Sequence, residues 1–435
     1  MPPIPFPPAL NGVKEGTFVF ITIKDRWPKI LTRVIDQVHR YRLTHIELYP
    51  KDGDNDIKSV IGELSELKYR MSTDKPLENV NDDGESSQIW NESLEMLRKS
   101  KSPENVTWFK TDWLFVECYL YRRIAGSFFK TRKMTELDPF ASLKQNSFVD
   151  SLPAMNTIGR YILENDWQRL PISDAKVKTA LLNLFQVCLW GNKCDLSLSV
   201  GNLTSPVLSP LQQIQQLESN ILVNDLELAE SLLRKGTAGR VDIVLDNAGI
   251  ELFSDLALAE FLLSACYVQK VVIHGKTLPW FVSDATGRDF AWLIEMLREN
   301  RHGSLSELGH KWHQRLADSQ IEFRCNSFWT LPFPYYMMKE KDPSLYSELS
   351  HSTLIIFKGD LNYRKLVGDL EWPLDTPFKI AVRGFHPSPF IALRTLKAET
   401  QAGLSEESIK RMKSEYGESK KWMVTGDYGV AQLCA

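Results

Sequence analysis

Residues 241–247 read Val-Asp-Ile-Val-Leu-Asp-Asn, an apolar run that ends on an acid and an amide. The chain then turns through Ala248-Gly249 into an apolar-periodic helical pattern. This sequence predicts a buried β-strand followed by a helix, with Asp246 and Asn247 at the carboxyl end of the strand. Ligands of open parallel sheets bind beyond that end of the strands, and Mg²⁺ and Mn²⁺ prefer hard oxygen ligands. The stretch therefore predicts a metal site at the edge of a parallel sheet.

Further segments with strand character follow, and polar residues come after each of them. The segments are 271–276, 321–325, 353–357, 378–382 and 391–393. The polar residues that follow are Asp284, Asn326, residues 358–365, Arg383 and residues 394–397. Long helical patterns separate several of these strands, which favours right-handed crossovers and a largely parallel sheet. We expect the polar groups to converge on one edge of that sheet.

The first half of the chain has helical patterns and lacks this alternation of strand and helix. Its main helical segments are 27–43, 112–128 and 177–190, and its long polar loops are 72–87 and 99–105. A Ser-Pro-Thr passage at 204–210 precedes a long helical pattern at 211–235. We therefore predict a mainly helical region at 1–210 and an α/β domain at 211–435. The polar segment 190–197 should end a helix, where Asn192 and Asp195 either cap helices or line the pocket.

Composition narrows the possible partners of this 435-residue chain. The chain is 43% hydrophobic and 25% charged, as in ordinary globular proteins, and its net charge of −3 gives no general attraction to nucleic acids or anionic membranes. It has no apolar stretch long enough for a membrane span, and its first residues do not resemble a signal peptide. We expect a soluble cytoplasmic protein, with nuclear residence also open. The six cysteines form no Cys-x-x-Cys pair, so we expect mostly buried thiols, and His310 and His313 lack a third metal ligand.

Several charged residues also have purely structural interpretations. Glu117, Arg122 and Arg123 fit an ordinary solvated ion-pair face of a helix, and Lys358 and Lys365 fit solvated surface charges. An isolated acid after a strand, such as Asp284, is often a helix N-cap. Glu251 and Asp255 occupy the first turns of a helix, where acids stabilise the helix dipole. Arg383 is an uncertain further contact for phosphate.

Residues 241–263, 359–365 and 394–397 together resemble the metal-dependent damage-control phosphatases, first catalogued as domain of unknown function 89. The Arg-Thr-x-Lys motif at 394–397 marks the third subfamily, the branch that also carries an acidic residue methyltransferase description. The segments 26–28, 117–123 and 190–192 resemble the family's helical half. The resemblance therefore covers nearly the whole chain.

This resemblance implies a three-layer α/β/α sandwich beside a helical domain. It implies a divalent metal held by Asp246, Asn247 and Asp284. The substrate contacts that it implies are Asp360, Leu361, Asn362, Tyr363 and Arg364, together with Lys397, which contacts the phosphate. The methyltransferase description would instead place Glu251 and Asp284 near S-adenosylmethionine. Asn192, Asp195, Asn326 and Arg394 are further candidates for the site.

The expected function is hydrolysis of phosphate monoesters of small metabolites, with sugar phosphates such as fructose 1-phosphate and fructose 6-phosphate as the favoured substrates. The expected cofactor is Mn²⁺ or Mg²⁺, with Co²⁺ and Ni²⁺ as alternatives. Asp246, Asn247 and Lys397 are the candidate catalytic residues, and Asp246 is either the nucleophile or only a ligand while a metal-bound water attacks. Two alternatives stay open: a carboxyl methyltransferase, although the usual Gly-rich loop is missing, and a non-catalytic metabolite-binding module.

Overall fold

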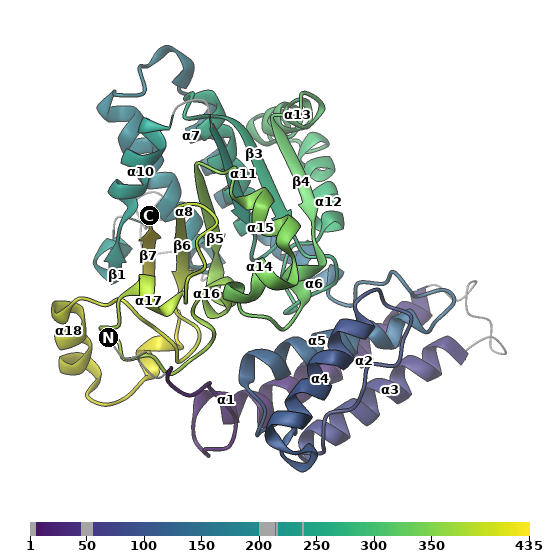
Figure 1. The fold of residues 1–435 in the computed structure, drawn as a ribbon. Coiled ribbons are helices and arrows are strands. Elements are labelled where there is room, and N and C mark those ends of the chain that lie inside the picture. Colours follow the sequence, from purple (N-terminus) through teal and green to yellow (C-terminus); the bar gives the residue numbers. More distant parts are fainter. Residues whose placement is uncertain (1–5, 45–54, 200–213, 215, 237–238) are drawn as a thin grey trace.

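The computed structural model describes residues 6–44, 55–199, 214, 216–236 and 239–435 (Figure 1). It contains a seven-stranded sheet flanked by helices and a separate group of N-terminal helices beside the sheet. The predicted α/β class with a mainly helical N-terminal region is therefore confirmed. The predicted domain boundary near residue 210 lies outside the described residues. No helix in the described ranges has the length and apolar character to cross a bilayer.

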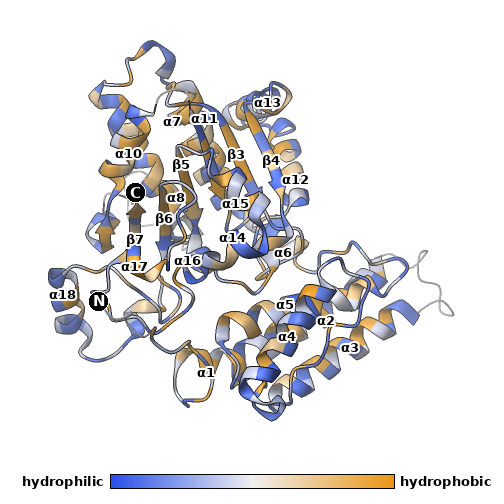
Figure 2. Cartoon of the chain, viewed as in Figure 1, coloured by the Kyte–Doolittle hydropathy of each residue, from blue (hydrophilic) through white to orange (hydrophobic). Residues whose placement is uncertain are grey.

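The N-terminal helices are amphipathic and pack through one face. In α2 (Trp27–Thr44) the buried residues are Trp27, Ile30, Leu31, Val34 and Val38, the spacing of a helix with one apolar stripe. Figure 2 shows the resulting mixture of hydrophobic and hydrophilic residues along α2, α3 and α4. The other helices of this half are α1 (Phe18–Ile21), α3 (Asn55–Ser72), α4 (Ser87–Lys101), α5 (Trp113–Phe129), α6 (Ala141–Asp150), α7 (Leu152–Leu163) and α8 (Ala175–Ser199). Of these, α5 is almost entirely buried.

The sheet has the strand order β1-β7-β6-β5-β2-β3-β4. Its strands are β1 (Ile221–Asn224), β2 (Gly239–Val244), β3 (Val268–Gly275), β4 (Ile321–Cys325), β5 (Leu354–Lys358), β6 (Phe390–Thr395) and β7 (Gly429–Cys434). The neighbouring strands are parallel except for β6 and β7. The carboxyl ends of β2 to β6 consequently share one edge, which faces the N-terminal helices (Figure 1).

Helices cover both faces of the sheet, and each face has its own hydrophobic core. Val241 and Ile243 of β2 belong to one core, and Val244 belongs to the other, because alternate strand residues face opposite sides. Buried on all sides, α11 (Ile250–Ser264) lies in the first core against α7 and α8. The remaining helices are α10 (Leu226–Lys235), α12 (Gly287–Arg298), α13 (Gly303–Ala317), α14 (Met338–Lys341), α15 (Pro343–Leu349), α16 (Gly359–Val367), α17 (Phe378–Ala381) and α18 (Glu406–Tyr416).

Three predicted elements differ from the structure. Instead of a strand, residues 378–381 form the short helix α17, whose first turn is closed by hydrogen bonds from the Ile380 and Ala381 N–H groups to the Pro377 carbonyl. The long helical pattern at 211–235 is interrupted by β1, because the apolar run Ile221–Val223 pairs with β7. Instead of ending near residue 190, α8 continues to Ser199. Gly191 serves close packing there rather than a helix stop, since a Cβ at this position would lie 3.2 Å from Glu251 Cγ.

Candidate metal and substrate site

The segment after β3 folds back against the end of β2 and brings the predicted metal ligands together. The Ala285 N–H donates to the Asp246 carbonyl at 2.8 Å, and the Ala248 N–H donates to the Ser283 carbonyl at 2.8 Å. These bonds form an antiparallel bridge between Asn247 and Asp284. Asp246 and Asn247, which are adjacent in the sequence, therefore share one rim of the sheet with the distant Asp284.

The acids and the lysine on this rim are buried, Asn247 and Ser283 are half-buried, and hydrogen bonds link these side chains. The Asn247 Nδ2 group donates to Asp246 Oδ2 at 2.9 Å and to Glu251 Oε1 at 2.7 Å. The Ser283 hydroxyl donates to Asn247 Oδ1. The Lys276 Nζ atom lies 3.4 Å from Asp284 Oδ2 and donates to the Leu245 carbonyl at 2.8 Å. Glu251 therefore holds the amide beside Asp246, and the helix dipole is not its only role.

Negative charge exceeds positive charge among these buried groups. Burial, together with the nearby carboxylates Glu251 and Asp284, raises the pKa of Asp246 well above its ordinary value. Burial raises the pKa of Asp284 to about 6, although Lys276 opposes the shift. Among the described residues, the ion pair with Lys276 is the contact of Asp284 Oδ2, which accepts no well-formed hydrogen bond. A divalent cation would offset this excess charge, so Asp246, Asn247 and Asp284 fit the donor set of a hard metal ion.

Asp284 is not the N-cap of the helix that follows it. The cap of α12 is Thr286, whose hydroxyl accepts from the Asp289 N–H, while the Asp289 carboxylate accepts from the Thr286 N–H at 2.8 Å. This reciprocal arrangement is a capping box. The capping interpretation of Asp284 is therefore wrong, and its carboxylate does not serve the helix start.

The turn between β5 and α16 closes the other side of the site. Gly359 has φ of +83°, and a Cβ at this position would lie 1.9 Å from Asp246 Oδ2. Asp360 Oδ1 accepts from Arg394 Nε at 2.7 Å and from the Lys397 N–H at 3.0 Å. Lys397 is exposed, and its charge acts to lower the pKa of Asp246. The structure thus places Asp360 and the Arg-Thr-x-Lys segment beside the predicted metal ligands.

The next four residues of α16 are buried in the protein. Arg364 donates through Nε and Nη2 to Asp369, and through Nη1 to Glu117 at 2.5 Å. The Tyr363 hydroxyl donates to Gln432 at 2.9 Å, and Leu361 belongs to a hydrophobic core. Asn362 is bound to backbone carbonyls. The substrate contacts of these four side chains stay a prediction, and each side chain also has a structural role.

Three of the other site candidates have local structural roles, and the side chains of two more lie outside the described residues. The Asn326 amide donates to Asp342 at 3.0 Å and accepts from the Phe328 N–H, so it caps a short 3-10 turn. The Arg394 guanidinium also donates to the carbonyls of Thr400 and Ala398, which makes it an organiser of the loop after β6. Arg383 stacks on two aromatic rings. Asn192 and Asp195 lie in α8, and their side chains are outside the described residues.

The predicted solvated charges are largely buried. Glu117 contacts Arg364 and accepts from Trp27 Nε1 at 3.3 Å. Arg122 pairs with Asp82 within the core, whereas Arg123 stays partly exposed. Lys358 Nζ lies 2.8 Å from Asp255 Oδ1, and Lys365 Nζ donates to two carbonyls after β4. Most of these partners are far away along the chain, which is why the local pattern resembles a surface.

Sequence reasoning missed Lys276, Ser283 and Gly359 as parts of the site. Lys276 comes directly after β3, so the rule that polar groups follow strand ends was sufficient to find it. Gly359 follows β5 in the same way. Ser283 precedes Asp284 within a loop and carries no comparable signal.

The histidines and cysteines lie outside this site. His310 and His313 are exposed on α13 and belong to no group of potential metal ligands among the described residues. Cys118, Cys188 and Cys434 are buried free thiols.

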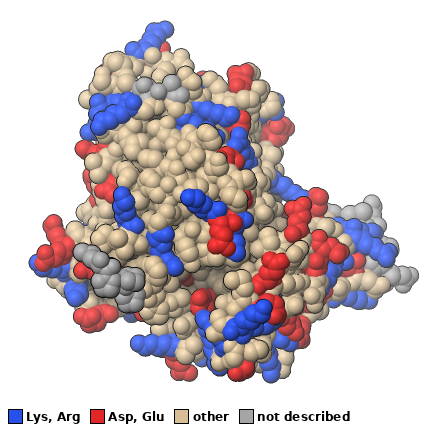
Figure 3. Space-filling view, viewed as in Figure 1, with Lys and Arg blue, Asp and Glu red and all other residues tan. Residues whose placement is uncertain are grey.

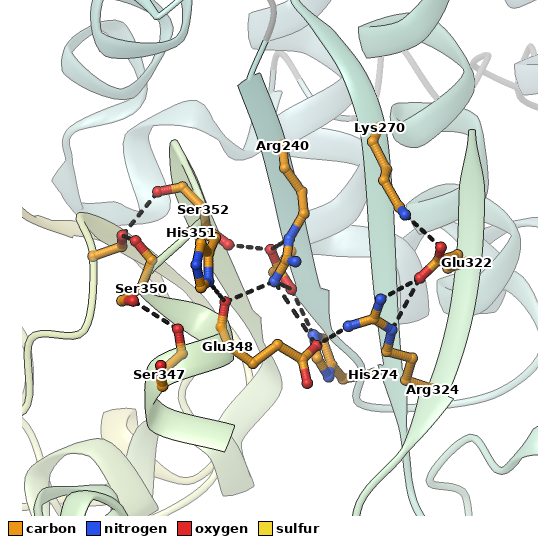
Figure 4. Close-up of polar contacts among 12 residues, drawn as sticks. Arg240, Lys270, His274, Glu322, Arg324, Ser347, Glu348, Ser350, His351 and Ser352 are labelled. Atoms are coloured by element: carbon orange, nitrogen blue, oxygen red, sulfur yellow. Dashed lines mark hydrogen bonds and ion pairs between the residues drawn. The ribbon is translucent and has the colours of Figure 1, made fainter. Parts of the chain in front are cut away.

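A second acidic group lies further back on β2 and β3 (Figure 4). Potential ligand atoms of Asp242, His274 and Glu348 lie within 4.8 Å of one another, a geometry that could hold a metal. His274 Nε2 is 2.7 Å from Asp242 Oδ1, and Arg240 donates to both oxygens of Asp242. Arg324 pairs with Glu348. Although burial opposes the shift, the contacts with His274 and Arg240 lower the pKa of Asp242. The positive charges of Arg240 and Arg324 therefore already offset the carboxylates of Asp242 and Glu348.

Charges of both signs are interspersed over the face of the molecule shown in Figure 3. A cavity of about 520 Å³ lies between α5 and the segments on either side of Asp284. Its lining is mainly apolar and includes Phe128, Leu137 and Leu278. A smaller cavity of about 90 Å³ contacts Asn247 and Ser283 directly.

Comparison with known proteins identifies the family. Residues 22–412 match the model of the damage-control phosphatase ARMT1-like domain. The chain is 40% identical to damage-control phosphatase ARMT1 of Xenopus laevis and 39% identical to that of Homo sapiens, with 98% of each chain covered in both comparisons. A crystal structure of a DUF89 family protein from Pyrococcus horikoshii aligns over 81% of this chain and 91% of its own, with 14% identity and a TM-score of 0.40. The chain therefore belongs to the ARMT1-like family of damage-control phosphatases.

Proposed function

We propose that this phosphatase is metal-dependent and hydrolyses phosphate monoesters of small metabolites, with sugar phosphates such as fructose 1-phosphate and fructose 6-phosphate as substrates. The observation that carries the proposal is the set of two buried acids, Asp246 and Asp284, and the half-buried amide of Asn247, beside the exposed Lys397. The excess of carboxylates over cations on this rim supports a divalent ion, Mn²⁺ or Mg²⁺, as the missing positive charge.

Hydrolysis of phosphate monoesters requires a barrier reduction of about 20 kcal/mol or more. A bound divalent ion supplies charge neutralisation and activation of an oxygen ligand. Asp246, Asn247 and Asp284 would hold that ion, with Glu251 fixing the amide of Asn247 through its hydrogen bond. The ammonium group of Lys397 would bind the phosphoryl oxygens and stabilise their charge during the reaction. In this proposal the acidic side of the site, Asp246 and Asp284, binds the metal, and its basic side, Lys397, binds the phosphate.

Asp360 is the proposed contact for substrate hydroxyls. Its side chain is 16% exposed, whereas Arg394 beside it is fully buried. Arg394 and the Lys397 N–H both donate to Asp360 Oδ1, so the carboxylate is fixed and its second oxygen is the candidate acceptor. The remaining contacts implied by the family, Leu361 to Arg364, would act through the start of α16, which borders the site.

Two routes of attack fit Asp246. Its carboxylate attacks phosphorus and the bond to the ester oxygen breaks, which releases the sugar alcohol and gives an aspartyl phosphate that water then hydrolyses; or Asp246 serves as a ligand while water attacks directly and displaces the same alcohol. The first route inverts phosphorus twice and retains its configuration, whereas the second inverts it once. The stereochemistry of hydrolysis of a chiral phosphate ester therefore distinguishes them.

The proposal is tested by release of inorganic phosphate from a panel of sugar phosphates. The protein is first stripped with a chelator, and Mg²⁺, Mn²⁺, Co²⁺ or Ni²⁺ is then restored singly. We expect metal-dependent turnover that Asp246→Ala abolishes. Equal turnover in the variant, or no turnover with any metal, would contradict the proposal. Calorimetry with S-adenosylmethionine, run in parallel, would test the methyltransferase alternative.

A further inference from the structure

Asn362 joins the ends of two neighbouring strands. Its side chain is 1% exposed, and its Nδ2 atom lies 3.3 Å, 3.1 Å and 2.7 Å from the carbonyl oxygens of Val244, Leu245 and Lys358. The Tyr335 hydroxyl donates to Asn362 Oδ1. Both polar atoms of the Asn362 amide are therefore engaged by protein groups.

These carbonyls lie where the ladder between β2 and β5 stops. The last paired residues are Val244 of β2 and Phe357 of β5. Beyond them β2 and β5 form no further pair, and buried carbonyl groups there need other donors. The Asn362 amide supplies a donor at this point and bonds to both segments, through the carbonyls of Leu245 and Lys358. Asn362 thus links the two segments where the ladder has ended, and it shares the Leu245 carbonyl with Lys276.

The two segments joined by Asn362 also contact each other closely on the rim, through Gly359 and Asp246. Leu245 is followed directly by Asp246, and Lys358 is followed directly by Gly359. The Gly359 backbone packs against the Asp246 carboxylate so closely that a Cβ would overlap it. The position of Asp246 relative to α16 therefore depends on how the strand ends are held together.

We propose that Asn362 is a positioning residue that holds Asp246 in place for metal binding, with Tyr335 orienting its amide. The inference rests on the proposed metal-dependent function. It differs from the substrate contact implied by the family resemblance, because a positioning residue acts on the metal ligand while a substrate contact acts on KM. Groups that orient metal ligands typically change metal affinity or activity by ~10- to 100-fold when they are removed.

The test compares Asn362→Ala, Tyr335→Phe and the double variant with a stability control, Leu366→Ala. Leu366 is a fully buried apolar residue of the same helix. Mn²⁺ affinity is measured by electron paramagnetic resonance of chelator-stripped protein, alongside Tm, kcat and KM with a sugar phosphate. We expect Asn362→Ala to weaken Mn²⁺ binding and lower kcat by ~10-fold or more, with little change in KM at saturating metal. The milder Tyr335→Phe should weaken Mn²⁺ binding by a few-fold, and the double variant should match Asn362→Ala.

The control separates positioning from general loss of stability. Leu366→Ala should lower Tm while retaining wild-type Mn²⁺ affinity. The proposal is overturned if Asn362→Ala loses no more Mn²⁺ affinity than Leu366→Ala, or if KM rises while Mn²⁺ affinity is unchanged. If Asn362→Ala does not fold, wild-type Mn²⁺ affinity in Tyr335→Phe is the overturning result. A wild-type protein that binds Mn²⁺ but releases no phosphate would contradict the proposed function alone, since metal affinity still tests the positioning role.

Discussion

Two acidic groups, one within β2 and β3 and one just beyond their carboxyl ends, differ in how their charge is balanced. The inner group, Asp242 with His274, is paired with Arg240, and its contacts lower the pKa of Asp242. The rim group, Asp246 with Asp284, has a higher pKa than usual at both carboxyls because burial and like charge are not fully offset. Asp242 and Asp246 are separated by three residues of one segment. The comparison shows that unmatched charge, rather than the number of acids, marks the candidate site.

The two groups should therefore respond oppositely to neutralisation. Removing a charge from a matched network leaves a buried partner without its counter-ion and destabilises the fold. Removing a charge from a group with excess negative charge relieves repulsion and stabilises the metal-free fold, but it lowers activity. Substitutions that change one carboxylate at a time can sharpen or break this contrast.

The largest effect should come from Asp246→Asn. We expect phosphate release to fall by more than ~10²-fold, since this side chain is a proposed metal ligand and even groups that only support a ligand cost up to that amount. The metal-free variant should at the same time be more stable than the wild type by ~0.5–2 kcal/mol, because one buried charge is gone. Denaturant unfolding of chelator-stripped proteins measures this difference. A less stable, fully active variant would break the comparison.

Lys397→Ala should lower kcat/KM by ~10²-fold, because a fixed cation on the phosphoryl oxygens is lost. The side chain is exposed, so Tm should stay close to that of the wild type. Lys410→Ala, at an exposed ion pair of α18, is the matched control and should keep full activity. Steady-state kinetics with and without added salt check both variants. Wild-type kinetics in Lys397→Ala would remove this residue from the site.

Asp242→Asn should destabilise the protein by ~3–5 kcal/mol while the activity of the folded protein is kept, because Arg240 loses its buried counter-charge. The folded-state pKa of Asp242 is lowered, so its contribution is present above the unfolded value of 3.8 and is lost as pH falls through the folded value. The stability gap between wild type and variant should therefore shrink below about pH 4. Urea unfolding at several pH values measures the gap, and a gap that widens on acidification would be inconsistent with this role.

The smallest effect should come from Thr286→Ala. This change removes one half of the capping box of α12 and should cost ~1 kcal/mol of stability. Asp284→Asn should leave that cap intact and act on metal affinity instead. Thermal unfolding without metal, followed by titration with Mn²⁺, separates the two. Equal loss of stability in both variants would return Asp284 to the role of a helix cap.

The sequence was sufficient to predict the strand ends of the rim. The acid and amide after β2 and the acid after β3 are local signals, and parallel strands bring such signals to one edge. The partners of buried charges could not be predicted in this way. Glu117 and Arg364 are 247 residues apart, and nothing near either residue shows that the other neutralises it. The α16 residues likewise resemble a polar surface until the N-terminal helices cover them.

Binding of Mn²⁺ to chelator-stripped protein tests the central claim most directly. Calorimetry should be run on the wild type, Asp246→Asn and Asp242→Asn under conditions in which all three are folded. The account predicts that Asp246→Asn loses Mn²⁺ binding and that Asp242→Asn keeps it. Binding that survives in Asp246→Asn and disappears in Asp242→Asn would place the metal at the inner group and contradict the account.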